Sequence, residues 1–263
     1  MDLFNSHQLT TLLLAFFSGF LPTMVWLYFW LRETRDNPEP PIMVAVAFIG
    51  GSIGVFISLF LEKFAFSDIT KIIVSSSFLQ PIKIFFDNIA TLKNIAFDRL
   101  LLVTVYAPVI EETTKFVIAY FLVLRSKEDN RPIDPIIYMI ATALGFSAIE
   151  NTLFLINPFS NHDVTLSIFT GNMRFVGATL LHTICSATIA MFIGFNFFDS
   201  WIKKTFFIFI GVLSAIVIHG VFNYFMVGDS QSSIIALELI WVSVIIILLA
   251  FEKIKKIRQE KIC

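Results

Sequence analysis

The chain has 263 residues, of which 57% are hydrophobic and 15% charged, and its mean hydropathy is +0.82. These values lie outside the range of soluble domains of similar length and predict an integral membrane protein. The formal net charge is −1, and motifs for binding nucleic acids, phosphates or dinucleotides are absent, so no nucleic-acid partner is expected. We expect residues 1–263 to form one membrane domain surrounded by lipid.

Apolar runs of roughly 20 residues, each long enough to span a bilayer as a helix, recur along the chain. They predict an all-α, polytopic bundle of about seven transmembrane helices. In chain order the runs are Gln8 to Leu31, Ile42 to Leu61, Arg99 to Leu124, Ile133 to Ile156, Phe175 to Phe198, Thr205 to Val227 and Ile234 to Phe251.

The segment of about residues 62–98 has a different pattern. Charged and amide side chains interrupt its apolar residues at nearly helical intervals, which is typical of an amphipathic helix lying on the membrane surface. We therefore favour an interfacial segment here over the alternative of an eighth span, which would invert the first two spans and fit the charge distribution less well. The interrupting residues are Lys71, Gln80, Lys83, Asp87 and Lys93.

The distribution of basic residues predicts the orientation. An outer amino terminus puts the connections at 32–41 and 125–131, the Lys203 and Lys204 pair and the basic carboxyl-terminal tail on the cytoplasmic side. The start of the chain lacks the basic region of a signal peptide, so the first run should be retained. We expect a multi-pass protein of the plasma membrane. The basic residues of the tail are Lys253, Lys255, Lys256, Arg258 and Lys261.

Three charged residues lie inside the third apolar run, which reads APVIEETTKFVIA over residues 107–119. An ionised group at bilayer depth costs roughly 2.5–3.5 kcal/mol, so these residues need partners, water or a function. Glu111 and Lys115 are one helical turn apart and are expected to pair. Glu112 points about 100° away and has no evident partner on its own helix.

Later runs carry further polar residues: Glu150, Asn151, His182, His219 and Asn223. His219 and Asn223 share a face with small residues at four-residue steps, and so does His182, which favours close helix contacts. With the predicted orientation and a rise of 1.5 Å per residue, these groups and Glu111 lie about 10–18 Å from the outer ends of their helices. Similar depth predicts one cavity in the outer half of the membrane.

Each residue also has a structural interpretation. A buried ion pair can be purely structural, Asn151 can bridge helices, and a lone intramembrane histidine is often a packing residue. Several ionisable groups on converging faces favour a functional site. His7 and His162 lie in terminal or loop sequence and are expected to be bystanders, whereas Arg174 and Asp163 are expected near the outer surface, as solvated charges or shaping access.

Four motifs carry a family resemblance: EETTK (111–115), FSAIEN (146–151), the helix of His182, and HGVFN (219–223). In this order on successive helices they resemble the PrsW family of intramembrane proteases, related distantly to the CAAX prenyl endopeptidases and to bacteriocin-immunity membrane proteins. The resemblance covers roughly Leu100 to Asn223, within catalytic helices expected over about residues 99–227. It implies hydrolysis of a peptide bond near the outer side of the bilayer, with membrane-anchored anti-sigma factors as the substrate class.

Hydrolysis of an amide requires a base, donors for the oxyanion and an acid for the leaving amine. We assign the base to Glu111 or Glu112, the water site to His182 and His219, and an oxyanion donor to Asn223. Glu150 is a second acid or a positioning group. Two supporting residues are expected to hold the others in place, Lys115 and Asn151.

A metal-dependent version is equally compatible with these residues. Glu112, His182 and His219 match a catalytic shell for zinc or another divalent ion, with the remaining glutamate as base. No local HExxH spacing supports a metal, and the resemblance to the prenyl-protease branch favours metal-free glutamate chemistry. The sequence leaves the cofactor open.

Two other functional classes compete with the protease. A proton- or ion-coupled transporter uses the same kinds of buried residues, although no internal repeat is detectable here. A catalytically inactive membrane scaffold would tolerate Glu112→Gln, whereas a protease would not.

Overall fold

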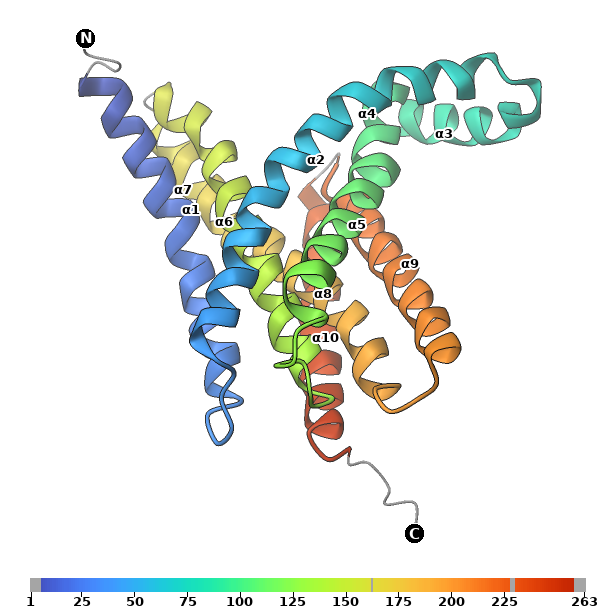
Figure 1. Ribbon diagram of the computed structural model, residues 1–263. Coiled ribbons are helices and arrows are strands. Elements are labelled where there is room, and N and C mark those ends of the chain that lie inside the picture. Colours follow the sequence, from blue (N-terminus) through green and yellow to red (C-terminus); the bar gives the residue numbers. More distant parts are fainter. Residues whose placement is uncertain (1–5, 162, 228–229, 258–263) are drawn as a thin grey trace.

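The computed structural model describes residues 6–161, 163–227 and 230–257, and those residues form helices and connecting loops without a strand. The predicted all-α polytopic bundle is therefore confirmed. The helices run back and forth between two ends of the molecule, with α1 starting at the upper end in Figure 1 and α10 finishing at the lower end. The α-helices are α1 (Ser6–Arg32), α2 (Pro41–Ser75), α3 (Gln80–Leu92), α4 (Phe97–Leu101), α5 (Ala107–Ala119), α6 (Asp134–Ser160), α7 (Val164–Met173), α8 (Thr179–Phe195), α9 (Trp201–Met226) and α10 (Ser230–Ile254).

Six helices of the described chain are long and apolar enough to cross a membrane, and they correspond to six of the seven predicted spans. The other prediction, 99–124, is a helical run in which α4 and α5 are joined and followed by the π-helical segments η2 (Leu102–Tyr106) and η3 (Tyr120–Leu124). It is not among the six. Buried Glu111, Glu112 and Lys115 lie in the middle of this run.

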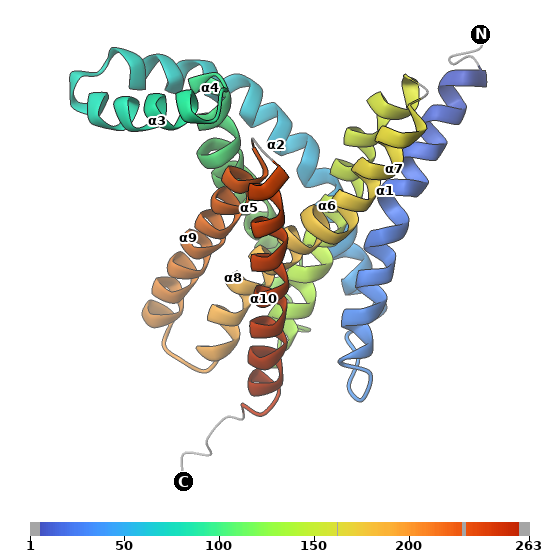
Figure 2. The ribbon, with the colours of Figure 1, turned by 180° about the vertical axis from the view of Figure 1, so that it is seen from behind.

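The predicted interfacial segment begins inside a longer helix. Helix α2 continues to Ser75, and a short 3-10 turn, η1 (Ser77–Leu79), leads into α3. The end of α2 and α3 project together from the bundle on the side of α5 and α9 (Figures 1 and 2). Helix α3 pairs Lys83 with Asp87 at 2.5 Å and exposes Ile84 and Phe85. It is amphipathic, as predicted.

Helix α6 is the centre of the bundle and packs against α1, α2, α5 and α8. Its residues from Asp134 to Ala148 are all buried. Two glycines let α2 and α6 approach closely: a Cβ on Gly51 would lie 1.8 Å from the Thr142 oxygen, and one on Gly145 would lie 1.9 Å from the Phe48 oxygen. This contact holds α2 beside the half of α6 that carries Glu150.

The lower end of α6 is fixed by four residues that we call the loop cluster: Glu39, Arg131, Asp134 and Tyr138. Glu39 accepts hydrogen bonds from the Arg131 guanidinium and, at 2.8 Å, from the Tyr138 hydroxyl. Asp134 accepts from the backbone N–H of Arg131 at 2.7 Å, and its other oxygen lies 2.7 Å from Arg131 Nε. Burial, with the neighbouring Asp134 carboxylate, raises the pKa of Glu39 to about 7.

The fifth predicted span starts earlier than expected. A continuous helix runs over Val164–Phe195, because the π-helical segment η4 (Arg174–Ala178) joins α7 to α8. Arg174 therefore lies within a membrane helix and not at its outer end. Asp163 remains at the amino-terminal end of α7, where its carboxylate accepts from the Leu166 N–H at 2.8 Å. His162, Arg258 and Lys261 lie outside the described residues.

Candidate active site

The charged residues of α5 are buried together, but their pairing differs from the expected one. Lys115 Nζ donates to Glu112 Oε1 at 2.6 Å, and both side chains are fully buried. The expected pair of Glu111 with Lys115 is wrong. A flexible lysine side chain reaches an acid three residues back as readily as one four residues back, so Glu111 is left to face the neighbouring helices.

Helix α9 brings His219 against Glu112. His219 Nδ1 lies 2.7 Å from Glu112 Oε1, the oxygen that Lys115 also contacts. The close approach of α9 to η2 depends on Gly220, the residue after His219, because a Cβ there would lie 2.2 Å from the Thr104 backbone oxygen. The Asn223 amide donates to the Val103 oxygen at 2.8 Å, one turn further along α9. The predicted shared face of α9 thus meets the start of the α5 run.

Helix α8 places His182 between the two acidic helices. Its Nδ1 lies 2.9 Å from Lys115 Nζ on α5, and its Nε2 lies 2.7 Å from Glu150 Oε2 on α6. The His182 and His219 rings are 5.3 Å apart and nearly perpendicular. Both imidazoles are buried. Through these contacts five of the predicted residues form one connected group: Glu112, Lys115, Glu150, His182 and His219.

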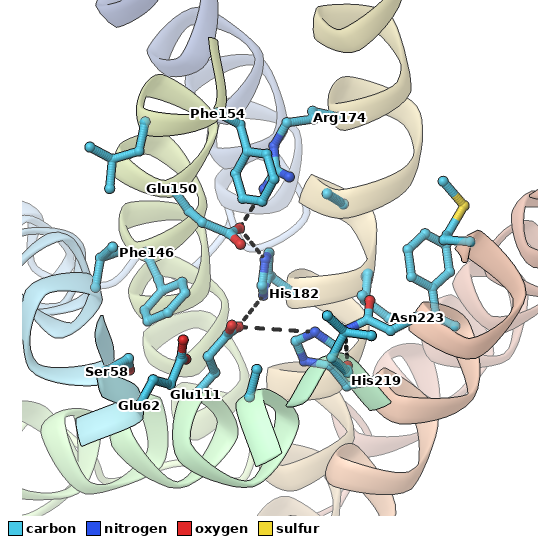
Figure 3. Close-up of a pocket in the computed structure, with 18 of the residues that line it drawn as sticks. Ser58, Glu62, Glu111, Phe146, Glu150, Phe154, Arg174, His182, His219 and Asn223 are labelled. Carbon is cyan, nitrogen blue, oxygen red and sulfur yellow. Dashed lines mark hydrogen bonds and ion pairs between the residues drawn. The ribbon is translucent and has the colours of Figure 1, made fainter. Parts of the chain in front are cut away.

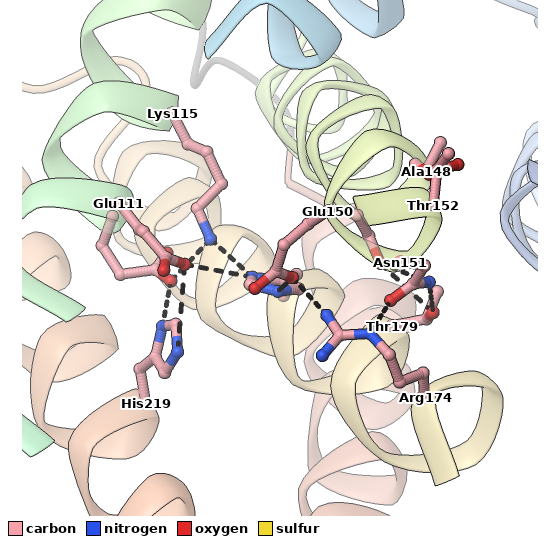
Figure 4. Close-up of polar contacts among 12 residues, drawn as sticks. Glu111, Lys115, Ala148, Glu150, Asn151, Thr152, Arg174, Thr179 and His219 are labelled. Atoms are coloured by element: carbon pink, nitrogen blue, oxygen red, sulfur yellow. Dashed lines mark hydrogen bonds and ion pairs between the residues drawn. The ribbon is translucent and has the colours of Figure 1, made fainter. Parts of the chain in front are cut away.

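The network continues from Glu150 to Arg174 (Figure 4). Arg174 donates to Glu150 Oε2 and to Asn151 Oδ1, each at 2.5 Å, and its guanidinium lies 4.0 Å from the Phe154 ring centre. Asn151 also donates to Thr179 Oγ1 at 2.9 Å and so bridges α6 to α8. Arg174 is 13% exposed. It lines the cavity, so its expected role as a solvated surface charge is wrong, whereas a role in shaping access stays a prediction.

A cavity of about 410 Å³ opens beside these residues. Glu111, Glu150, His182, His219 and Asn223 all line it (Figure 3), whereas Glu112 and Lys115 are not among its lining residues. The predicted common cavity is therefore present. Helix α2 contributes wall residues that the sequence motifs did not include, among them Ser58 and Glu62.

Four side chains can present ligand atoms to one metal ion: Glu111, Glu112, His182 and His219. The four atoms all lie within 4.8 Å of one another, and all four residues are buried. Glu111 Oε2 and Glu112 Oε2 have no hydrogen-bond partner. Glu111 Oε2 is 3.9 Å from His182 Nδ1 and 4.0 Å from His219 Nε2, separations that one ion with bonds of about 2.0–2.2 Å can bridge. Two carboxylates and two imidazoles fit a zinc-type donor set.

The fold and the site define a multi-pass membrane protein with acids and imidazoles around an internal cavity. The family model described as PrsW family intramembrane metalloprotease matches residues 39–251. The chain belongs to the PrsW family and is an intramembrane protease.

Two curated relatives are both named Protease PrsW. The protein from Clostridioides difficile (strain 630) is 27% identical over 223 residues, which cover 84% of this chain and 83% of the relative. The protein from Geobacillus kaustophilus (strain HTA426) is 24% identical over 128 residues, 48% of this chain and 52% of the relative. No solved structure matches this chain.

Two residues that line the cavity, Arg174 and Glu62, were not predicted as site residues, for different reasons. Arg174 stands just before Phe175, where the fifth span was predicted to begin, whereas the helix begins at Val164. The hydrophobic character of 164–173 was the available signal, because it allows the helix to start earlier. Glu62 stood at the border between a span and an amphipathic segment, where a surface carboxylate is the default. Its neighbour one turn back, Ser58, is a small polar residue on the same helical face and was the only local sign of a buried polar stripe.

Proposed function

We propose that the chain hydrolyses a peptide bond of a membrane-anchored protein at the outer side of the plasma membrane, with Glu111 as the general base. The observation that carries this role is the position of Glu111. It is the one member of the α5 charged group that lines the cavity, and its Oε2 has no hydrogen-bond partner and lies about equally far from both imidazoles.

In this mechanism a water molecule between Glu111 and the imidazoles attacks the carbonyl carbon. Its proton passes to the Glu111 carboxylate as the new C–O bond forms. The tetrahedral intermediate then collapses, the C–N bond breaks, and Glu111 returns the proton to the leaving amine. The second N–H of the Asn223 amide is a donor for the oxyanion, because the first is held by Val103.

The other residues position the reacting groups. Glu112 Oε1 contacts both Lys115 Nζ and His219 Nδ1, and so holds α9 against α5. Glu150 fixes the His182 ring and is itself held by Arg174. If a divalent ion is bound, His182, His219 and Glu112 would hold it, and it supplies Lewis-acid polarisation of water and of the carbonyl. Glu111 then remains the base.

The proposed side of cleavage follows from the expected orientation. With the amino terminus outside and the carboxyl terminus in the cytoplasm, the depths expected from the helix rise put Glu111 in the outer half of the bilayer. Anti-sigma factors are the substrate class that the family resemblance implies. We propose such a membrane-anchored protein as the natural substrate.

The test is cleavage of single-span reporter proteins, with a metal analysis of the purified enzyme. Glu111→Gln should lower the rate by about 10²–10⁴-fold, the usual contribution of a general base. Glu238→Gln, which changes an exposed glutamate on α10, is the matched control and should keep full activity. Stoichiometric zinc that His219→Ala loses supports the metal version. Reporter cleavage that survives Glu111→Gln would overturn the assignment of the base.

A transporter remains the second candidate, because buried acids and imidazoles also line proton pathways. The discriminating experiment is proton flux in proteoliposomes. Flux driven by a gradient, abolished by Glu111→Gln and accompanied by intact reporters, would favour transport over proteolysis.

A further inference from the structure

The wall of the cavity that α2 forms carries two polar side chains with no assigned role. Ser58 and Glu62 are four residues apart, share one face of the helix, and both line the cavity. In Figure 3 they lie on one side of the cavity, and Arg174 and Asn223 lie on the other. They are not part of the motifs that define the catalytic residues.

Glu62 differs from the other cavity acids in its partners. Glu150 is paired with Arg174 at 2.5 Å, and Glu111 lies between two imidazoles. In the described part of the chain, the Glu62 carboxylate has neither a hydrogen bond nor an ion pair, although it lies within electrostatic range of Glu150 and Glu111. A half-buried carboxylate near two others strongly favours a cation beside it.

Ser58 independently indicates that this part of the cavity binds a polar group of a ligand. Its side chain is 1% exposed, and its hydroxyl has no partner among the described residues. Serines in membrane helices usually bond to a backbone carbonyl of the preceding turn, as Ser52 does to Phe48 at 3.0 Å. A buried hydroxyl that forgoes this bond and faces a cavity is available to a ligand.

Building on the function proposed above, we propose that Ser58 and Glu62 form a specificity subsite that binds a lysine or arginine side chain of the substrate near the cleaved bond. The peptide is the ligand class that the protease must admit. A basic side chain supplies N–H donors for both the carboxylate and the serine hydroxyl, and it supplies the missing positive charge. Val55 and Leu59, which line the same wall, offer an apolar surface for its aliphatic stem.

The first arm of the test compares matched reporters that carry Lys, Gln or Glu at each of several positions around the cleaved bond. Wild type should cleave the best Lys reporter with a kcat/KM about tenfold or more above the Gln reporter. Glu62→Gln should collapse this ratio to within about twofold, and Glu62→Asp should restore most of it. Lys63→Gln changes the exposed adjacent residue and should leave the ratio unchanged.

The second arm measures binding without cleavage. Purified Glu111→Gln protein is titrated with the labelled Lys and Gln reporters in detergent micelles, alone and combined with Glu62→Gln. Tighter binding of the Lys reporter, lost in the double variant, supports the subsite even if no reporter is cut. Failure of cleavage with this preference intact would therefore count against the proposed reaction and not against the subsite.

Two results would overturn the subsite. One is a Lys to Gln preference that Glu62→Gln leaves unchanged in both arms. The other is an equal loss of cleavage for all reporters with unchanged relative binding, which would assign Glu62 to the chemistry or to the fold.

Discussion

Among the described residues, two buried clusters of charged side chains contact α6, and they differ in how closely their carboxylates are approached. In the loop cluster both oxygens of Glu39 and both oxygens of Asp134 lie within 2.8 Å of an Arg131 or Tyr138 atom, although Asp134 Oδ1 meets Arg131 without hydrogen-bond geometry. Around the cavity, Glu111 Oε2 lies 3.9 Å and 4.0 Å from its two imidazoles, and neither it nor Glu112 Oε2 has a hydrogen-bond partner. Burial of charge alone is thus common to both clusters. The wider spacing around Glu111 and the adjoining cavity distinguish the proposed catalytic cluster from the loop cluster.

The largest effect on stability is expected at the fully buried pair of the cavity. Lys115→Met leaves Glu112 charged and without its cation, which should lower the free energy of unfolding by roughly 3–5 kcal/mol. The double variant Lys115→Met/Glu112→Gln removes both charges and should recover much of that loss while remaining inactive. Thermal unfolding in detergent and reporter cleavage measure the two effects. Equal stability of the single variant and wild type would contradict this account of the pair.

A smaller effect is expected in the loop cluster, since Arg131 is 27% exposed. Arg131→Met should cost about 1–3 kcal/mol, less than a fully buried pair because water replaces part of the lost interaction. Cleavage per folded molecule should stay close to that of wild type. Lys127→Met, a change of an exposed residue in the same loop, is the control. A variant that folds normally but has lost its activity would show that this cluster has more than a structural role.

The smallest effect is a pH dependence of stability from Glu39. Its pKa is raised from 4.5 to about 7, so the folded state holds a proton that the unfolded chain has released. The stabilising contribution is complete below about pH 4.5 and is lost as the pH rises through about 7. Melting temperatures of wild type should therefore fall between pH 5 and pH 8 more steeply than those of Glu39→Gln. Parallel curves would contradict the shifted pKa, and Glu128→Gln, at an exposed loop position, is the control.

The sequence predicted the architecture and most of the ionisable residues that line the cavity, because hydrophobic length and the cost of buried charge act locally. Six spans follow from apolar runs; Glu150, His182 and His219 stand out as expensive exceptions within them, as Glu111 does in the seventh run, 99–124. Pairing was less predictable. Whether Lys115 contacts Glu111 or Glu112 depends on where α8 and α9 place their histidines, which is a tertiary property.

Glu62 illustrates the same limit at longer range. It is separated from Glu111 by 48 intervening residues, and its place in the cavity depends on the contact of α2 with α6 at Gly51 and Gly145. A helical pattern assigns faces within one helix, but it does not say which neighbour each face meets. Contacts of this kind require the packed structure.

The π-helical segment η4, before α8, changes the direction in which Arg174 points around the helix axis relative to His182. Arg174 and His182 are eight residues apart, which in an uninterrupted α-helix separates their directions by about 80°. The single extra residue accommodated by a π-turn reduces that angle to about 20°. Both side chains can then reach Glu150. Segment η4 thus works as a one-residue insertion that turns the outer part of the helix until its arginine faces the same acid as the histidine below.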